Sequence, residues 1–480
     1  MNRLHAGRLA DLPAAVAAPR HLLPGKTGIV HFGPGAFHRA HQAAYIDTVL
    51  NHDPRWGIAA VSLRTRGTIA ALEEQGGAYT IGIRDAEPGW RVIAAHNRFL
   101  AADDAAETAA LLASADVGLV TTTVTEKGYC LAADGTLDAG HPDIVHDLAG
   151  PAVPRSVIGW IVSGLAARKA AGVPPFVPMP CDNLANNGAK LHAALAAFAR
   201  LTDAELARWI EGEVRVPATM VDSITPASDA AFLDMTAAAL GMRDDAAVQR
   251  ESFVQWVIED IGRPLGPDLG GSGATITSDV AGYENAKLRL LNGPHSTLAY
   301  AGLLRGHASV AEAMGDAALA SFVEAMMREE IAPVLRQVPG LDLGDYVGAV
   351  LARFRNPAII HRLEQIAMDG SQKLPYRLVD TLAEARRRGL LPARICAALG
   401  CWIAFAMRRA RAGTTIVDPL GSVIADAAAE GDGATVLGRL LAEGMLLPPD
   451  LAADAPVAAA ISIAADAAFA GDWGAIHLAG

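Results

Sequence analysis

The feature that most constrains the fold of this chain is a short apolar run that ends in a Gly-x-Gly turn. Residues 28–32 have the pattern of a buried strand, and Gly33-Pro34-Gly35 follows them directly. A helix is expected after the turn, through residues 43–50. A second apolar run, residues 56–63, begins where the second strand of a βαβ unit would stand. The pattern predicts a parallel sheet covered by helices.

A turn of this kind is suited to phosphate groups. Gly33 would permit the tight turn, and Gly35 would let the backbone approach a pyrophosphate at the helix N-terminus. The third glycine of the dinucleotide-binding pattern is absent, since His38 stands there. The second strand ends in residues 62–66, which carry Arg64 and Arg66 but no acidic residue for the adenosine ribose. These residues alone favour a 2′-phosphate and leave the choice between NAD(H) and NADP(H) open.

Polar residues also follow three later apolar runs that are expected to be strands. They are Thr125 and Glu126 after the first run, Asn183 after the second and Asp222 after the third. Open parallel sheets bind their ligands at the carboxyl ends of the strands, so a site for a polar substrate is expected there. Turn formation and helix capping are the alternative roles of the Asn and Asp residues.

The stretch 283–296 places Lys287, Asn292 and His295 among leucines. On an α-helix, Lys287 and His295 would lie about 80° apart, and Lys287 and Asn292 about 140° apart. Asn292 would flank the other two if the helix broke near Gly293-Pro294. A lysine, an amide and an imidazole around one pocket can transfer a proton and stabilise an oxyanion. An amphipathic helix with a surface lysine is the structural alternative.

Two domains are expected from the change in pattern near residue 280. Residues 1–280 would form an α/β Rossmann-type, dinucleotide-binding domain. Residues 281–480, in which helical periodicity continues almost to the end, would form a mainly α-helical substrate and catalytic domain. In the second part, a polar segment expected between helices carries Lys373 and Arg377, which could contact an anionic group. A basic helix start after a turn explains these two cations equally well.

Charge and cysteine content exclude several classes of function. The net charge of −12 gives no electrostatic support for a nucleic-acid partner. The four cysteines form no CxxC pair and no Cys/His cluster with zinc spacing, so no metal site is expected. No apolar run reaches the ~18 residues of a membrane span, and residues 1–24 lack a compact hydrophobic signal region. We expect a cytoplasmic protein whose oligomeric state stays open, with a monomer compatible with the sequence.

Several motifs in a fixed order carry a resemblance to a known family. They are residues 33–42 (Gly-Pro-Gly-Ala-Phe-His-Arg-Ala-His-Gln), 123–130 (Thr-Val-Thr-Glu-Lys-Gly-Tyr-Cys), 181–183 (Cys-Asp-Asn), 220–222 (Met-Val-Asp) and 287–296. Together they resemble the polyol-specific long-chain dehydrogenases, the mannitol dehydrogenase family, from about residue 26 to beyond residue 420. The resemblance implies a Rossmann-type domain, a mostly helical second domain, a nicotinamide cofactor that is usually NAD(H), and no metal.

The resemblance also implies catalytic roles. Lys287 would move the proton of the reacting hydroxyl, and Asn183 and Asn292 would hold the developing oxyanion. A free lysine titrates at about 10.4, so this role requires desolvation or nearby positive charge. Matching residues with supporting roles are His295 for substrate orientation, Glu284 as the gate of a proton path and Asp222 as an active-site carboxylate. The residues expected to hold the cofactor are Phe32, Gly33, Gly35, Ala36, Phe37, Arg64, Thr125 and Glu126.

Within the family, residues 125–130, 253–260 and 365–375 look most like the D-mannonate oxidoreductases, or fructuronate reductases. That subgroup interconverts D-fructuronate and D-mannonate with NAD(H) in hexuronate breakdown. A carboxylate-bearing substrate would give Lys373 and Arg377, beside His295, an anionic partner. Ser223 and Tyr376 depart from the pattern, where many members have Arg and Gln. A neutral polyol such as mannitol or arabinitol is therefore the alternative substrate.

Two further alternatives concern the chemistry itself. Tyr283-x-x-x-Lys287 mimics the Tyr-x-x-x-Lys pair of short-chain dehydrogenases, in which Tyr is the acid. So short a motif arises often by chance, and the long match makes Lys287 itself the base. A non-catalytic dinucleotide-binding module would be expected to lose its general base, whereas Lys287 is present.

Overall fold

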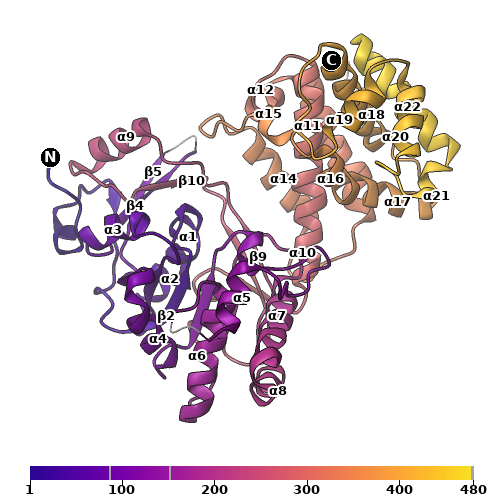
Figure 1. The fold of residues 1–480 in the computed structure, drawn as a ribbon. Coiled ribbons are helices and arrows are strands. Elements are labelled where there is room, and N and C mark those ends of the chain that lie inside the picture. Colours follow the sequence, from indigo (N-terminus) through magenta and orange to yellow (C-terminus); the bar gives the residue numbers. More distant parts are fainter. Residues whose placement is uncertain (86–87, 151–152, 477–480) are drawn as a thin grey trace. The chain divides into compact units, whose positions relative to one another are not determined.

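The computed structural model describes residues 1–85, 88–150 and 153–476, with the side chains of Thr68 and Glu126 left out. The chain divides into two compact units, Met1–Val280 and Ala281–Gly480, here the N-terminal and C-terminal units. Among the described residues, all named strands lie in the N-terminal unit, and the C-terminal unit is built of helices (Figure 1). The predicted fold class, a Rossmann-type α/β domain followed by a mainly helical domain, is confirmed.

A five-stranded parallel sheet forms the centre of the N-terminal unit, in the order β6-β3-β2-β7-β8. The strands are β2 (Thr27–Phe32), β3 (Gly57–Val61), β6 (His96–Leu100), β7 (Leu119–Thr122) and β8 (Val177–Pro180). Every residue of β2, β3, β7 and β8 is buried, as expected for strands covered on both faces. The strand order reverses between β2 and β7, so their carboxyl ends flank the crevice in which such sheets bind ligands.

Helices lie between and around the strands of the N-terminal unit. They are α1 (Ala36–Ala40), α2 (Gln42–Val49), α3 (Gly67–Glu74), α4 (Ala105–Ala113), α5 (Pro142–Leu148), α6 (Val157–Ala171), α7 (Asn187–Thr202), α8 (Ala204–Glu213) and α9 (Ala230–Leu240). The single helix expected after the Gly-x-Gly turn is instead two, because the backbone of His41 leaves the helical region at φ −116° and ψ −88°. A 3-10 turn, η3 (Glu126–Tyr129), follows β7.

Among its described residues, this unit also contains two smaller sheets. One has the order β1-β5-β4-β10 and the other β12-β11-β9. Their strands are β1 (Val16–Ala17), β4 (Tyr79–Ile83), β5 (Gly89–Ile93), β9 (Thr219–Asp222), β10 (Val248–Arg250), β11 (Gln255–Glu259) and β12 (Thr275–Thr277). The prediction that Asp222 ends a strand of the parallel sheet is wrong, since β9 pairs antiparallel with β11 in a separate sheet.

The C-terminal unit contains α10 (Val280–Ala286), α11 (Gly293–Leu304), α12 (Val310–Gly315), α13 (Ala317–Ala325), α14 (Leu343–Phe354), α15 (Leu363–Ile366), α16 (Gly370–Leu374), α17 (Asp380–Arg387), α18 (Ala393–Arg411), α19 (Gly421–Ala428), α20 (Gly433–Ala442), α21 (Pro449–Ala452) and α22 (Ala455–Ala470). Helix α18 is buried along most of its length and packs against α11 and α22. In the part of the chain that the structure describes, no helix combines the length and apolarity needed to cross a bilayer.

Three π-helical segments interrupt these helices: η4 (Lys287–Asn292), η5 (Met326–Ile331) and η7 (Pro375–Val379). The helix does not break near Gly293-Pro294, the condition under which Asn292 would flank Lys287 and His295, because η4 joins α10 to α11 without leaving the helical region. The polar segment expected between helices is also mostly helical, since α16, η7 and α17 follow one another directly. π-Helical segments are rare and occur frequently at functional sites.

Candidate functional site

The turn after β2 has the geometry that its glycines suggest. Gly33 has a φ of 89°, and a Cβ atom there would lie 2.5 Å from the carbonyl oxygen of Thr123. Only glycine therefore fits without displacing the end of β7. A Cβ at Gly35 would meet no atom closer than 3.9 Å, the carbonyl oxygen of Gly33. The space in front of Gly35 is thus open to a ligand.

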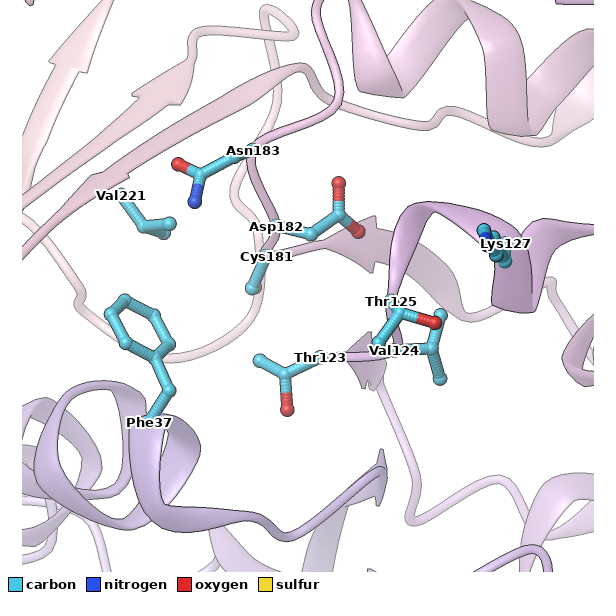
Figure 2. Close-up of a pocket in the computed structure, with 9 residues that line it drawn as sticks. All are labelled: Phe37, Thr123, Val124, Thr125, Lys127, Cys181, Asp182, Asn183 and Val221. Carbon is cyan, nitrogen blue, oxygen red and sulfur yellow. The ribbon is translucent and has the colours of Figure 1, made fainter. Parts of the chain in front are cut away.

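Two cavities lie at the carboxyl ends of the parallel strands. The first, called the Asn183 cavity, measures about 560 Å³ and is lined by Phe37, Thr123, Val124, Thr125, Lys127, Cys181, Asp182, Asn183 and Val221. Figure 2 shows the ring of Phe37 and the side chains of Thr123, Cys181 and Asn183 arranged around an open space. The second, called the Arg64 cavity, measures about 500 Å³, and Gly33, Ser62, Arg64 and Ser156 contribute to its lining. Residues 123–125 and Lys127 line both cavities, which are therefore adjacent.

Several predicted site residues of this unit meet at these cavities. Those that line a cavity are Gly33, Phe37, Arg64, Thr125 and Asn183. Gly35 and Ala36 stand at the start of α1, whereas Phe32 is fully buried in β2. Asp222 is buried, and its neighbour Val221 lines the Asn183 cavity. The side chain of Glu126 lies outside the described residues.

Asp182, which was not predicted as a site residue, is held by a buried tyrosine. The Tyr129 hydroxyl donates to the Asp182 carboxylate and lies 2.6 Å from the Thr122 hydroxyl oxygen. Burial, followed by the nearby Asp182 carboxylate, raises the pKa of Tyr129 well above its usual value, so the phenol keeps its proton. The backbone N–H of Leu184 donates to the other oxygen of Asp182 at 3.1 Å. These bonds fix the loop that presents Asn183.

The end of β3 offers one available cation rather than the two that the sequence suggests. Arg66 forms ion pairs with Asp103, Asp104 and Glu73. Of these two arginines, Arg64 is the one that lines the Arg64 cavity, and its side chain is exposed. The preference for a 2′-phosphate inferred from two arginines is correspondingly weaker.

Potential metal ligands also meet in the wall of the Arg64 cavity. Ligand atoms of Cys130, His141 and Asp143 all lie within 4.8 Å of one another, a grouping that their sequence spacing does not reveal. His141 Nδ1 accepts the backbone N–H of Asp143 at 3.2 Å, as a helix cap does. Arg64 and Arg155 line the same cavity, and their charge opposes a bound cation.

In the C-terminal unit, the predicted catalytic stretch is the π-helical segment η4. The backbone N–H of Gly293 donates to the carbonyl of Leu288, five residues earlier. A π turn brings residues i and i+5 together, so Lys287 and Asn292 lie closer than the 140° of an α-helix implies. Pro294 follows directly in α11 and has no N–H to donate to the preceding turn. Glu284, Lys287 and Asn292 are all half-buried.

His295 lies buried in the same unit, in a group of cations. Its ring packs against those of His361 and Phe354, at centroid distances of 4.5 and 5.2 Å. Burial, followed by the neighbouring His361, Arg377, Arg353 and Lys373, lowers the pKa of His295 far below its usual value. Its Nε2 atom is buried and has no hydrogen-bond partner among the described residues. A neutral imidazole with an unused nitrogen is suited to a polar ligand.

Lys373 and Arg377 lie near His295. The Arg377 guanidinium donates to the Ser296 hydroxyl at 3.0 Å, while its buried Nε has no partner in the described chain. The Lys373 ammonium donates to the Met368 carbonyl at 2.7 Å and lies 3.5 Å from the Asp369 carboxylate. Burial and then Arg377 lower the pKa of Lys373. The predicted substrate residues His295, Lys373 and Arg377 therefore lie together, and Arg353 and His361 lie beside them. We call these five residues the His295 cluster.

Comparison with known proteins identifies the family to which each unit is similar. The family described as the mannitol dehydrogenase Rossmann domain matches residues 27–266, and the mannitol dehydrogenase C-terminal domain matches residues 279–467. The D-mannonate oxidoreductase of Escherichia coli (strain K12) is 38% identical over 446 residues, which cover 91% of this chain and 92% of that protein. A mannitol 2-dehydrogenase of Phaeosphaeria nodorum is 37% identical over 414 residues, covering 84% of this chain and 73% of its own.

A solved structure gives the same result. The ternary complex of Pseudomonas fluorescens mannitol 2-dehydrogenase with NAD and D-mannitol superposes with a TM-score of 0.79 at 34% identity, covering 99% of this chain and 98% of that one. Family and fold thus agree over nearly the whole sequence. The chain belongs to the mannitol dehydrogenase family of oxidoreductases.

Proposed function

We propose that this chain is an NAD(H)-dependent, metal-independent oxidoreductase that interconverts D-fructuronate and D-mannonate. The observation that carries the choice of substrate is the His295 cluster, where Lys373 and Arg377 lie near the buried His295 and where His295 Nε2 and Arg377 Nε have no partner among the described residues. Similarity to the D-mannonate oxidoreductase over 91% of the chain supports the same substrate class. A mannitol 2-dehydrogenase activity is the second candidate, favoured by the similarity to enzymes of that name.

The N-terminal unit fits a dinucleotide. The open space at Gly35 and the Arg64 cavity suit a pyrophosphate and its adenosine half, and the adjacent Asn183 cavity suits the nicotinamide. NAD(H) supplies the hydride chemistry when it is bound. Because Arg66 is already paired, we propose NAD(H) as the main cofactor, with Arg64 leaving some acceptance of NADP(H).

Proton transfer is assigned to Lys287. In the reductive direction a hydride reaches the ketone carbon, and the Lys287 ammonium gives a proton to the oxygen, so that a secondary alcohol forms. The amides of Asn183 and Asn292 stabilise the negative charge that develops on that oxygen. His295 orients the substrate, Glu284 gates the path by which a proton from solvent returns to Lys287, and Asp222 supports the site as a buried carboxylate.

The decisive experiment is a steady-state assay of reduced-cofactor absorbance. Fructuronate and fructose are compared as oxidants, and mannonate, mannitol and arabinitol in the reverse direction, each with both cofactors. The proposal expects fructuronate with NADH to give the highest kcat/KM. A higher value with fructose would favour the mannitol 2-dehydrogenase alternative, and no turnover with any substrate would favour a non-catalytic binding module.

Two adjacent glycines offer a matched test of the cofactor turn. Gly33→Ala should destabilise the protein, because the new methyl group meets the Thr123 carbonyl at a φ of 89°. Gly35→Ala should leave the melting temperature near wild type, since nothing in the protein opposes the methyl group. It should nevertheless raise the Kd for NADH roughly ten-fold by blocking the approach of the pyrophosphate. Thermal melts and NADH fluorescence titrations measure both effects, and unchanged NADH binding by Gly35→Ala would contradict this placement.

Lys373→Met tests the carboxylate of the substrate. Loss of one charge-assisted hydrogen bond should raise the KM for fructuronate roughly 10- to 100-fold. The KM for fructose should change little, because fructose has no charge to pair. Measuring both substrates with one enzyme preparation makes fructose the internal control. An equal rise in KM for both would show that Lys373 does not contact the carboxylate.

A further inference from the structure

A buried histidine stands behind the cofactor turn. His31 belongs to β2 and has no exposed surface. Its Nδ1 lies 2.7 Å from the Thr121 hydroxyl, and its Nε2 lies 2.9 Å from the Thr123 hydroxyl and 3.2 Å from the Gly33 carbonyl. The Thr123 hydroxyl in turn donates to the Gly33 carbonyl at 2.6 Å. The ends of β2 and β7 are thus joined through side chains beyond their backbone ladder.

One proton arrangement satisfies all of these contacts. Because the Thr123 hydroxyl gives its proton to Gly33, its oxygen must accept from His31 Nε2–H. His31 Nδ1 then accepts from the Thr121 hydroxyl. Burial lowers the pKa of His31 to about 3, so the ring stays neutral and keeps this tautomer over the working pH range. The result is a directed chain from Thr121 through His31 and Thr123 to Gly33, here called the His31 latch.

Packing fixes the plane of the His31 ring. His38 stacks on it with the ring centroids 3.4 Å apart and the planes 13° from parallel. Nε2 of His38 lies 3.0 Å from Nε2 of His96, which begins β6. His38 occupies the position where the usual pattern has its third glycine. In this chain the packed imidazoles of His31, His38 and His96 therefore support the Gly33 turn.

The latch acts on the residues that border both cavities. Gly33 lines the Arg64 cavity, and Thr123 lines both that cavity and the Asn183 cavity. A dinucleotide that occupied both cavities would pass the carboxyl ends of β2 and β7. Its fit depends on the distance between the Gly33 turn and the end of β7, which the latch sets.

We propose that His31 is a positioning residue for the nicotinamide cofactor, acting through Thr123 and the Gly33 carbonyl without touching the cofactor. This inference rests on the proposed function. It predicts an effect on cofactor affinity that is separate from the chemical step, since none of the residues proposed to move or stabilise charge belongs to the latch.

Three substitutions at one position separate this role from simple packing. His31→Phe keeps an aromatic ring but loses both ring nitrogens. His31→Gln can place an amide N–H where Nε2 stood, whereas His31→Asn can replace only Nδ1. We expect His31→Phe and His31→Asn to raise the Kd for NADH about ten-fold or more, with kcat at saturating NADH within about three-fold of wild type. His31→Gln should recover most of the affinity.

The measurements are NADH fluorescence titration, kcat and KM, and the melting temperature of each variant. Thr123→Val, which removes the hydroxyl of the latch at nearly constant volume, provides a second route if His31→Phe fails to fold, and it should raise the Kd similarly. Wild-type affinity in His31→Phe or Thr123→Val overturns the proposal. So does a loss of affinity that follows the melting temperature and is not rescued by His31→Gln. Failure of the wild-type protein to bind NADH would instead overturn the proposed function and, with it, the latch.

Discussion

Lys287→Met is expected to lower kcat by roughly 10²- to 10⁴-fold, the usual contribution of a positioned general acid or base. Methionine preserves the length and the apolar stem of the side chain and removes only the group that can carry a proton. Lys287 is half-buried and begins η4, so the substitution should leave the helix intact. The Kd for NADH should stay close to wild type, because the residues proposed to hold the cofactor belong to the N-terminal unit.

Tyr283→Phe is the matched control. The Tyr283 side chain is buried, and its hydroxyl donates to the Pro339 carbonyl at 3.0 Å, a contact that stabilises the fold. Its loss should cost about 1 kcal/mol of stability and little turnover. The tyrosine–lysine pair of short-chain dehydrogenases predicts the reverse. An enzyme silenced by Tyr283→Phe but active as Lys287→Met would refute the assignment of Lys287.

The strands that were predicted are those whose burial shows in the sequence. β2, β3, β7 and β8 lie inside the parallel sheet and appear as apolar runs. β5 and β6 are only partly buried, and Arg91 and Arg98 interrupt their apolar pattern. The position of β9 depends on long-range pairing: Asn187 exchanges hydrogen bonds with the Thr219 backbone at 2.9 and 3.0 Å. Local patterns contain no signal for such a contact.

The candidate site divides in the same way. Gly33 and Asn183 could be predicted because each closely follows an apolar run that is recognisable as a strand. A tight turn requires glycine, and polar residues at a strand end indicate a ligand site. The pairing of Arg66 with Asp103, 37 positions later, and of Tyr129 with Asp182, 53 positions later, appears only in the folded chain. The π turn at Lys287 is a third case. An i to i+5 hydrogen bond has no residue preference comparable to a helix cap. The α-helical angle predicted between Lys287 and Asn292 therefore does not hold in the structure.

Asn183→Ala should lower kcat by roughly 10²- to 10³-fold, as the loss of one oxyanion donor does in other enzymes. Asn183 lies on the exposed loop after β8, and its amide borders the Asn183 cavity (Figure 2). Removing an exposed amide should change the melting temperature little. The loss should appear in kcat rather than in the Kd for NADH, because the charge on the oxygen exists only during the reaction.

A neighbouring amide supplies the control for Asn183. Asn186 is also exposed and has a φ of 55°, so Asn186→Gly removes an amide from the same loop without straining the backbone. It should retain most of the wild-type kcat. Asn183→Asp should be at least as damaging as Asn183→Ala, since a carboxylate repels the developing oxyanion where the amide stabilised it. Equal activity of Asn183→Asp and Asn186→Gly would contradict the oxyanion role of Asn183. The Asn183 cavity would then bind substrate or cofactor without stabilising charge, and other donors would stabilise the oxyanion.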